Sequence, residues 1–226
     1  MIIRCIDVET LGLLPKDGVC EVGWCDLMPD QTGNGHTVVG LPHARFVDPG
    51  RPIPPAASAV HHITDEMVRG APPLAEVLAE ATHGAPALAA HVAKFEQQFV
   101  AAPVPWVCTW KIAVRLAPNA PEFKLQTLRY WCKLQADPEL ASPPHRAGPD
   151  AYICALLLSR MLAKMPLAEM VKLSAGPVLL PRFGFGKHAG VPLAEVPPDY
   201  LEWIVNKSEM TDENVLHTAR HYLSAA

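Results

Sequence analysis

The sequence lacks several features that would assign it to a large class of proteins. Its six cysteines form no Cys-x-x-Cys pair, which argues against a zinc cage or a disulfide framework and indicates buried thiols in a reducing compartment. Its longest helical apolar run, residues 151–158, is far too short to cross a bilayer. No export signal is visible, so we expect a cytoplasmic protein without a membrane span.

The chain also lacks an excess of positive charge. The 19 Lys and Arg side chains are outnumbered by 23 Asp and Glu side chains, giving a formal net charge of −4 and no general attraction to a polyanion. Nucleic-acid binding would therefore depend on local basic residues and bound metal. Half of the 226 residues are hydrophobic, which is typical of a globular protein, and the length suits one domain with an appendage.

Two acids, one position apart, follow the first apolar run of the chain. Side chains alternate between the faces of a strand, so Asp7 and Glu9 project the same way, about 7 Å apart. Two carboxylates on one face of a mostly buried strand repel each other and are poorly solvated, and a divalent metal relieves both penalties. The alternative is a strand that ends in two solvated acids at the edge of the sheet.

A second acidic motif opens the strongest helical pattern, which predicts a helix at 149–162. Pro149 favours the first helical position and puts Asp150 in the first turn. Ile153 and Leu157 then place that acid on the face that packs on the sheet. His145 precedes the helix, in a loop that reaches the end of the sheet. The ordinary alternatives are an acid that serves the free amides of the helix N-terminus and a histidine on the surface.

These two motifs together meet the requirements of two-metal phosphodiester hydrolysis. Carboxylates hold two ions about 3.5–4 Å apart, and a mobile histidine accepts a proton from the attacking water. Residues 7–13, DVETLGL, resemble the first motif of the DnaQ-like (DEDDh) 3′→5′ exonucleases, DxETTGL. Residues 60–64, VHHIT, are similar to their IHGIT element, and residues 145–150, HRAGPD, match their HRAxxD motif.

The resemblance implies a fold, a cofactor and a set of roles. The fold is α/β, a ribonuclease-H-like mixed five-stranded sheet flanked by helices, and the cofactor is a pair of Mg²⁺ or Mn²⁺ ions. The partner is the 3′ end of single- or double-stranded DNA, from which nucleoside monophosphates are released one at a time. The implied catalytic residues are His145 as general base and Asp7, Glu9, Glu96 and Asp150 as metal ligands, with substrate contacts from Thr10, Leu11, His61 and Phe95.

The second family motif is altered in this chain. The family has a histidine–asparagine pair and then a phenylalanine–aspartate pair, whereas this chain has Val92 for the asparagine and Glu96 for the aspartate. Glutamate is longer by one methylene and moves the carboxylate by roughly an ångström or more, whereas catalytic geometry tolerates roughly 0.5 Å. Glu96 also suits an exposed position on an amphipathic helix. An active enzyme is the leading hypothesis, because the other acids and the histidine are present.

Three alternatives to a DNA exonuclease follow from the same residues. They are a proofreading subunit of a polymerase, an exonuclease for short RNA, and a catalytically impaired nucleic-acid-binding protein that has lost the second motif. Basic residues near the motifs are candidates for phosphate contacts, and otherwise solvated surface charges: Lys94, Arg115, Lys124 and Arg129.

The sequence predicts an exonuclease domain, 1–168, and a small C-terminal hairpin-helix module, 169–226. In the module, Gly184, Gly186 and Gly190 with Lys187 indicate a glycine-rich hairpin, either a tight turn or a phosphate cradle. The predicted strands are 2–6, 19–27, 87–91 and 105–109, and residues 44–47 are predicted to be the end of a further strand after a turn at 30–35. The predicted helices are a short one after Thr64 and those at 74–82, 94–100, 111–116, 125–134, 149–162, 199–205 and 212–223.

Overall fold

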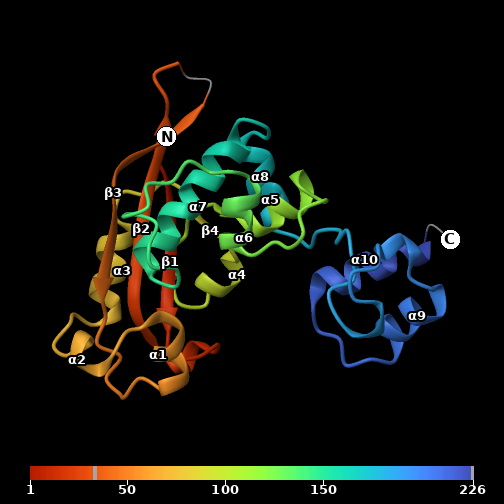
Figure 1. Ribbon diagram of the computed structural model, residues 1–226, viewed down its shortest axis with the longest axis horizontal. Coiled ribbons are helices and arrows are strands. Elements are labelled where there is room, and N and C mark those ends of the chain that lie inside the picture. The colour runs from red at the N-terminus through yellow and green to blue at the C-terminus, as the bar shows by residue number, and fades with distance from the viewer. Residues whose placement is uncertain (33–34, 225–226) are drawn as a thin grey trace.

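The computed structural model describes residues 1–32 and 35–224, and a mixed five-stranded sheet lies at its centre. The strand order is β3-β2-β1-β4-β5, in which the β3–β2 and β2–β1 pairs are antiparallel and the β1–β4 and β4–β5 pairs are parallel. This is the predicted ribonuclease-H-like architecture, with helices packed against the sheet (Figure 1). The strands are β1 (Ile3–Thr10), β2 (Val19–Pro29), β3 (His36–Phe46), β4 (Leu88–Ala90) and β5 (Trp106–Cys108).

The helices follow the predicted order, and the one predicted at 74–82 is confirmed residue for residue. Short 3₁₀ turns lie at η1 (Pro15–Asp17), η2 (Gly186–His188) and η3 (Leu193–Glu195). The α-helices are α1 (Pro55–His61), α2 (Asp65–Val68), α3 (Leu74–Thr82), α4 (Ala93–Glu96), α5 (Thr109–Leu116), α6 (Leu125–Trp131), α7 (Ala147–Leu162), α8 (Leu167–Ser174), α9 (Pro198–Asn206) and α10 (Glu213–Ser224).

Several predicted elements need correction. The helix predicted at 94–100 is the four-residue α4 followed by turns. The third strand, whose end was predicted at 44–47, is β3 and begins at His36. Helices α1 and α8 were not predicted. Residues 33 and 34 of the predicted turn at 30–35 lie outside the described residues. Among the described residues no single helix is long and apolar enough to cross a membrane; α7 and α8 reach that length and composition together, with a bend of 117° between them.

Strand β1 contributes to a hydrophobic core on each side of the sheet. Ile3 and Cys5 belong to the core under α7, whereas Ile6 and Val8 belong to the core shared with α3. Because side chains alternate along a strand, Asp7 and Glu9 continue the row of Ile3 and Cys5 on the α7 side. The strand therefore delivers both acids to the face that the longest helix covers.

Helix α7 lies directly on the sheet because β2 carries a glycine beneath its first turn. A Cβ on Gly23 would lie 2.1 Å from the backbone carbon of Ala147. A Cβ on Gly148 would lie 3.2 Å from Cβ of Ala44 on β3. The start of α7 and the sheet are therefore packed as closely as glycine allows. Gly23 is paired with Asp7 in the β1–β2 register. The same glycine therefore brings the helix start beside the first acid.

The C-terminal residues form a separate small core around Phe183, Leu201 and Ile204. The predicted hairpin is present as a short loop, in which the Phe183 amide donates to the Val191 carbonyl at 2.8 Å and η2 occupies the tip. This module lies beside the main domain and is joined to it by a linker (Figure 1). Its two larger helices are α9 and α10.

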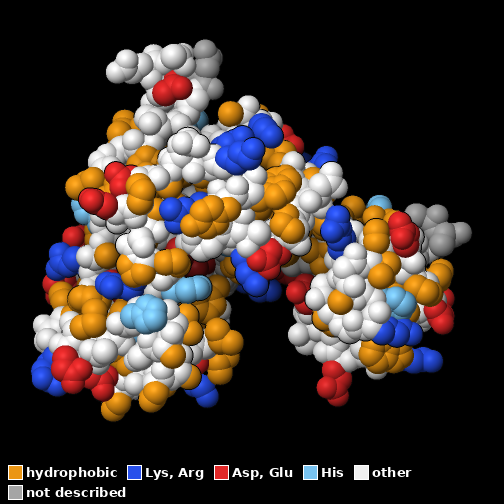
Figure 2. All heavy atoms as spheres, viewed as in Figure 1, with side chains coloured by type: hydrophobic (Ala, Val, Ile, Leu, Met, Phe, Trp, Pro, Cys, Tyr) orange, Lys and Arg blue, Asp and Glu red, His pale blue; other side chains and the backbone are white. Residues whose placement is uncertain are grey.

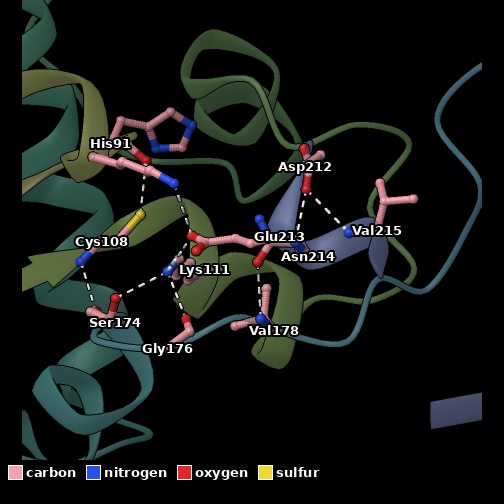
Figure 3. Close-up of polar contacts among 11 residues, drawn as sticks. His91, Cys108, Lys111, Ser174, Gly176, Val178, Asp212, Glu213, Asn214 and Val215 are labelled. Atoms are coloured by element: carbon pink, nitrogen blue, oxygen red, sulfur yellow. Dashed lines mark hydrogen bonds and ion pairs between the residues drawn. The ribbon is translucent and has the colours of Figure 1, made fainter. Parts of the chain in front are cut away.

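A buried lysine ties the module to the main domain (Figure 3). Lys111 of α5 donates to the carbonyls of Ser174 and Gly176 at 3.1 and 2.6 Å, and its Nζ lies 3.8 Å from a carboxylate oxygen of Glu213. Helix α8 belongs to the main domain, where Met170 is fully buried. The predicted division between residues 168 and 169 therefore falls inside α8, and the two hydrophobic cores separate after Ser174.

Replacing Gly23 by alanine is expected to displace the start of α7, because the new methyl group would overlap the backbone of Ala147. We expect a loss of about 1–3 kcal/mol or more in the free energy of unfolding, measured by chemical denaturation. Gly184→Ala is the matched control, since a Cβ there meets nothing within 4 Å. Equal stability of the two variants would contradict the close contact.

Candidate active site

Three carboxylates converge at the junction of β1 and α7. Asp7, Glu9 and Asp150 each bring an oxygen to within 4.8 Å of the others. Asp7 and Glu9 come from β1, and Asp150 comes from the first turn of α7, as predicted. Glu9 and Asp150 expose only 9% and 8% of their surface. The two acidic motifs therefore form one largely buried cluster.

Two donors from outside α7 hold Asp150 in this position. The side-chain amide of Gln126 on α6 donates to Oδ1 at 2.6 Å, and the backbone amide of His145 donates to Oδ2 at 2.9 Å. Asp150 thus accepts hydrogen bonds from an adjacent helix and from the preceding loop, and its orientation is fixed. The role of Gln126 was missed at the sequence level, because nothing local in α6 indicates which element its side chain meets.

A buried ion pair fastens the start of α7 to the sheet. Glu21 of β2 is 1% exposed, and it accepts hydrogen bonds from Nε of Arg146 and from the Ala147 amide, both at 2.9 Å. The Arg146 guanidinium also lies 5.3 Å from the centroid of the Phe46 ring. Sequence reasoning missed this pair, although an acid within the apolar run of β2 is a visible indication that Glu21 needs a partner.

Burial makes the acid cluster hard to ionise. The pKa of Asp7 is raised well above its ordinary value, first by burial and then by the charges of Glu9, Asp150 and Glu96. Burial and the charge of Asp150 raise the pKa of Glu9 to about 8. Burial also raises the pKa of Asp150, and the hydrogen bonds that it accepts partly offset that rise. Such mutual repulsion is relieved when a cation lies among the acids.

Glu96 lies near this cluster without joining it. Its side chain is 5% exposed, so the alternative of an exposed acid on an amphipathic helix is wrong. Burial raises its pKa to about 8, and within the described residues its Oε2 has no hydrogen-bond partner. Its charge contributes, after burial, to the raised pKa values of Asp7 and Glu9. A buried carboxylate oxygen without a donor is a group that needs a cation.

His145 lies in the loop before α7 and is exposed to solvent. Its backbone has a φ of 58°, in the left-handed region that most residues avoid. The same residue donates its backbone amide to Asp150. The predicted loop position is therefore present, and the backbone of His145 is anchored beside the acid cluster while its side chain stays exposed to water.

Two of the predicted substrate contacts, Thr10 and Leu11, lie at the end of β1. The Thr10 hydroxyl donates to the Gly12 carbonyl at 2.7 Å, and the Leu11 amide donates to the Gly18 carbonyl at 3.1 Å. Leu11 is 7% exposed, and its side chain belongs to a small core with Cys20. Thr10 is therefore the more accessible of the two predicted contacts.

His61 is buried rather than presented at the surface. It is 2% exposed, its Nδ1 accepts the Ile63 amide at 3.1 Å, and its Nε2 lies 3.7 Å from the sulfur of Cys20. Burial lowers its pKa, which favours the neutral ring. The next residue, His62, is exposed and stands where the IHGIT element has glycine. Its φ of 60° is in the left-handed region that favours glycine. His61 thus packs beneath residues 62–64, and its contact with a nucleotide stays a prediction.

The altered second motif surrounds α4. Phe95 is half-buried and packs edge-on against Phe99, with ring centroids 5.4 Å apart. Val92, in place of the family asparagine, is 47% exposed. The ring of His91 lies 3.0 Å from the Thr109 hydroxyl and 2.7 Å from the Phe123 carbonyl. Burial lowers the pKa of His91 to about 4. His91 is therefore a neutral structural residue.

The four basic candidates for phosphate contacts have different surroundings. Lys94 and Lys124 form exposed ion pairs with glutamates at 3.5 and 2.9 Å. Arg129 donates to the Ala141 carbonyl at 3.1 Å, and Arg115 is exposed on α5. Their phosphate contacts stay predictions.

Comparison with known proteins assigns the chain and its fold to a family. The family model described as Exonuclease, RNase_T, matches residues 5–158. The chain belongs to this exonuclease family. The exonuclease is 31% identical over 227 residues to exodeoxyribonuclease 10 of Escherichia coli strain K12, and the match covers 98% of each chain. It is 27% identical over 172 residues to DNA polymerase III subunit epsilon of Treponema pallidum, covering 70% of this chain and 74% of that protein.

Solved structures agree with this assignment. The structure of exonuclease X in complex with 5′ overhanging duplex DNA has a TM-score of 0.64 and 31% identity, and covers 76% of this chain and 99% of that chain. The structure of exonuclease I has a TM-score of 0.57 at 15% identity, and covers 76% of this chain and 42% of that chain, which supports the fold alone. The resemblance inferred from the motifs is therefore confirmed at the level of the family.

The residues present fit the divalent metals that this exonuclease family implies. Carboxylate oxygens are the ligands that Mg²⁺ and Mn²⁺ prefer, and the cluster offers three acids within 4.8 Å of one another. The unpartnered buried Oε2 of Glu96 lies close enough to influence their ionisation. Sites of this composition hold hard cations.

The metal-free exonuclease is expected to lose stability as the pH rises through about 8. Glu9 and Glu96 bind protons more tightly in the folded chain, where their pKa is about 8, than in the unfolded chain. Their contribution is therefore fully present below the unfolded pKa and lost as the pH rises through the folded one. Thermal unfolding in EDTA between about pH 6.5 and about pH 8.5 measures this fall, in a range where His91 stays neutral.

Mn²⁺ is expected to restore stability at the upper end of that range, because it neutralises the ionised acids. Glu9→Gln removes one titrating group and is expected to flatten the pH profile. A profile that is equally steep in this variant would contradict the assignment of the effect to the acid cluster.

Proposed function

We propose that this exonuclease removes nucleoside monophosphates one at a time from DNA 3′ ends by two-metal hydrolysis. The observation that carries the proposal is the convergence of Asp7, Glu9 and Asp150 within 4.8 Å in a buried setting that disfavours their ionisation. Acids that cost stability in the free protein need a compensating ligand. A pair of Mg²⁺ or Mn²⁺ ions is the ligand that their chemistry favours.

Four acids would hold the ions. Asp7, on the central strand, would be shared by both ions, and Glu9 and Asp150 would complete one site. Glu96, with its unpartnered oxygen, would stand in for the family aspartate at the other. When bound, such ions lower the pKa of a water nucleophile and neutralise charge on the leaving oxygen. Gln126 and the His145 amide keep Asp150 in the orientation that this requires.

His145 is proposed to accept the proton of the attacking water. Its ring is exposed in the loop that also anchors Asp150, so it can reach a water beside the acids and release the proton to solvent. Thr10 and Leu11 are proposed to contact the terminal nucleotide, and Phe95 to flank it. His61 supports that segment from its buried position.

DNA is the proposed substrate, single- or double-stranded. The support is the likeness over nearly the whole chain to exodeoxyribonuclease 10 of Escherichia coli and to exonuclease X solved with 5′ overhanging duplex DNA. Six free cysteines, five of them buried, support the reducing cytoplasm as the proposed location. The division into an exonuclease domain and a small C-terminal module is proposed to persist in solution.

Oligonucleotides labelled at the 3′ or the 5′ end test the reaction. We expect Mg²⁺- or Mn²⁺-dependent release of labelled mononucleotide from the 3′ end, and a ladder of shortened products from the 5′-labelled strand. His145→Ala is expected to reduce the rate by about 10²–10⁴-fold, because the general base is lost, and Asp7→Ala to abolish it. Glu169→Ala, an exposed acid on α8, is the matched control. Cleavage within the strand, or full activity of Asp7→Ala, would overturn the proposal.

Glu96→Asp tests the altered second motif. We expect activity at least equal to wild type, because aspartate restores the side-chain length of the family pattern. The rate is measured in Mg²⁺ and in Mn²⁺, beside a Mn²⁺ titration that reports ligand affinity. A clear fall in the rate would show that the surroundings of Glu96 have adapted to glutamate.

A further inference from the structure

Helices α5, α6 and α7 enclose a pocket that the nuclease chemistry does not use. Its volume is about 320 Å³, within the range of sites that take a small ligand or a single anchoring side chain. The floor consists of alanine, leucine and methionine side chains, and Trp131 at the end of α6 forms part of the rim. No lining side chain is a carboxylate, an amide or a hydroxyl. The interior is therefore apolar.

Three basic residues surround this pocket. Lys133, Arg160 and Lys164 all line it and are all exposed. Within the described residues none of them belongs to an ion pair. Figure 2 shows basic and apolar side chains gathered together where α7 ends. Arg160 also donates to the Cys132 carbonyl at 2.6 Å. A largely apolar cavity bordered by three cations that lack an ion-pair partner is complementary to an apolar group that carries negative charge beside it.

Lys133 occupies its position at a conformational cost. Its φ of 51° is in the left-handed region, and the Lys133 and Leu134 amides bond back to the Tyr130 and Arg129 carbonyls at 3.0 Å, which closes the end of α6. Glycine is the usual residue at such a position. A lysine kept there places its charge at the mouth of the pocket.

We propose that this pocket binds an acidic segment of a partner protein, with an apolar side chain of that segment in the cavity and its carboxylates on the three cations. A nucleobase fits poorly, because the lining side chains include donors but no carboxylate, amide or hydroxyl to accept from the N–H groups of a base. A phenylalanine or leucine side chain has no such groups to satisfy. The charge and the shape of the pocket thus favour a peptide over DNA.

The pocket is separate from the acid cluster. Asp150 lies in the first turn of α7 and Arg160 in the last, ten residues apart, which is about 15 Å along a helix. A peptide in the pocket therefore leaves the acids accessible. The interaction is one of attachment, and it does not depend on the nuclease reaction proposed above.

A fluorescein-labelled peptide with three consecutive acids followed by a phenylalanine is the probe. Fluorescence anisotropy with the full chain is expected to show saturable binding that weakens as salt rises. Peptides with the acids changed to asparagine, or the phenylalanine to serine, are expected to bind at least about tenfold more weakly. Equal binding of all three peptides, or no binding of the first, would overturn the proposal.

Variants separate the pocket from general surface charge. Lys164→Gln is expected to weaken peptide binding by about threefold or more, whereas Lys172→Gln, an exposed lysine of α8 outside the pocket, leaves it unchanged. Lys133→Gly is expected to weaken binding and at the same time to raise the melting temperature by about 2–4 °C, because glycine suits the positive φ. Loss of binding therefore cannot be mistaken for loss of the fold. Unchanged affinity in both pocket variants would contradict the site.

Cys132 provides a direct report of occupancy. It lines the pocket and is half-buried, whereas the other five cysteines are buried. The acidic peptide is expected to slow alkylation of Cys132 by iodoacetamide at least about fivefold, with exonuclease activity on a labelled oligonucleotide unchanged. Protection by a single-stranded oligonucleotide in place of the peptide, tested in Asp7→Ala, would show a nucleic-acid site and overturn the proposal.

Discussion

The close contact between the start of α7 and the central sheet determines where the acids of this exonuclease lie. Gly23 lets the backbone of Ala147 come to where a side chain would otherwise be, and the buried pair of Glu21 and Arg146 holds the helix there. Asp150 consequently lies beside acids from the opposite end of the domain. These carboxylates raise one another's pKa, because their negative charges repel each other. Packing elsewhere in the fold keeps them together until cations offset their repulsion.

The parts of this arrangement that depend on local pattern could be predicted from the sequence. Strand alternation placed Asp7 and Glu9 on one face, and helix periodicity turned Asp150 toward the sheet. The contacts of Gln126 and Glu21 could not be predicted, because they depend on which side chains meet between distant elements. The end of the exposed β3 was predicted but its first part was not, since few of its side chains are buried and it has little apolar periodicity. Helix α4 was overestimated because turns with apolar residues continue its pattern.

The altered second motif changes the polarity of the site more than its charge. Glu96 keeps a carboxylate in a buried position, and its free oxygen preserves the need for a cation there. Val92 replaces a polar family residue with an exposed apolar one. The chain therefore retains its negative groups while losing one polar group near the substrate side. Such a change is expected to alter the affinity for the nucleotide more than the rate of the hydrolysis step.

Helix α7 links two sites that have different purposes. Its first turn supplies Asp150, a proposed metal ligand, and its last turn supplies a cation at the mouth of the pocket. The helix is mostly buried and packs on β1, β2 and β3, so it is a rigid spacer rather than a movable element. Coupling between distant sites requires an element with two arrangements. A rigid spacer instead favours simple attachment, in which a bound partner leaves the rate of hydrolysis unchanged.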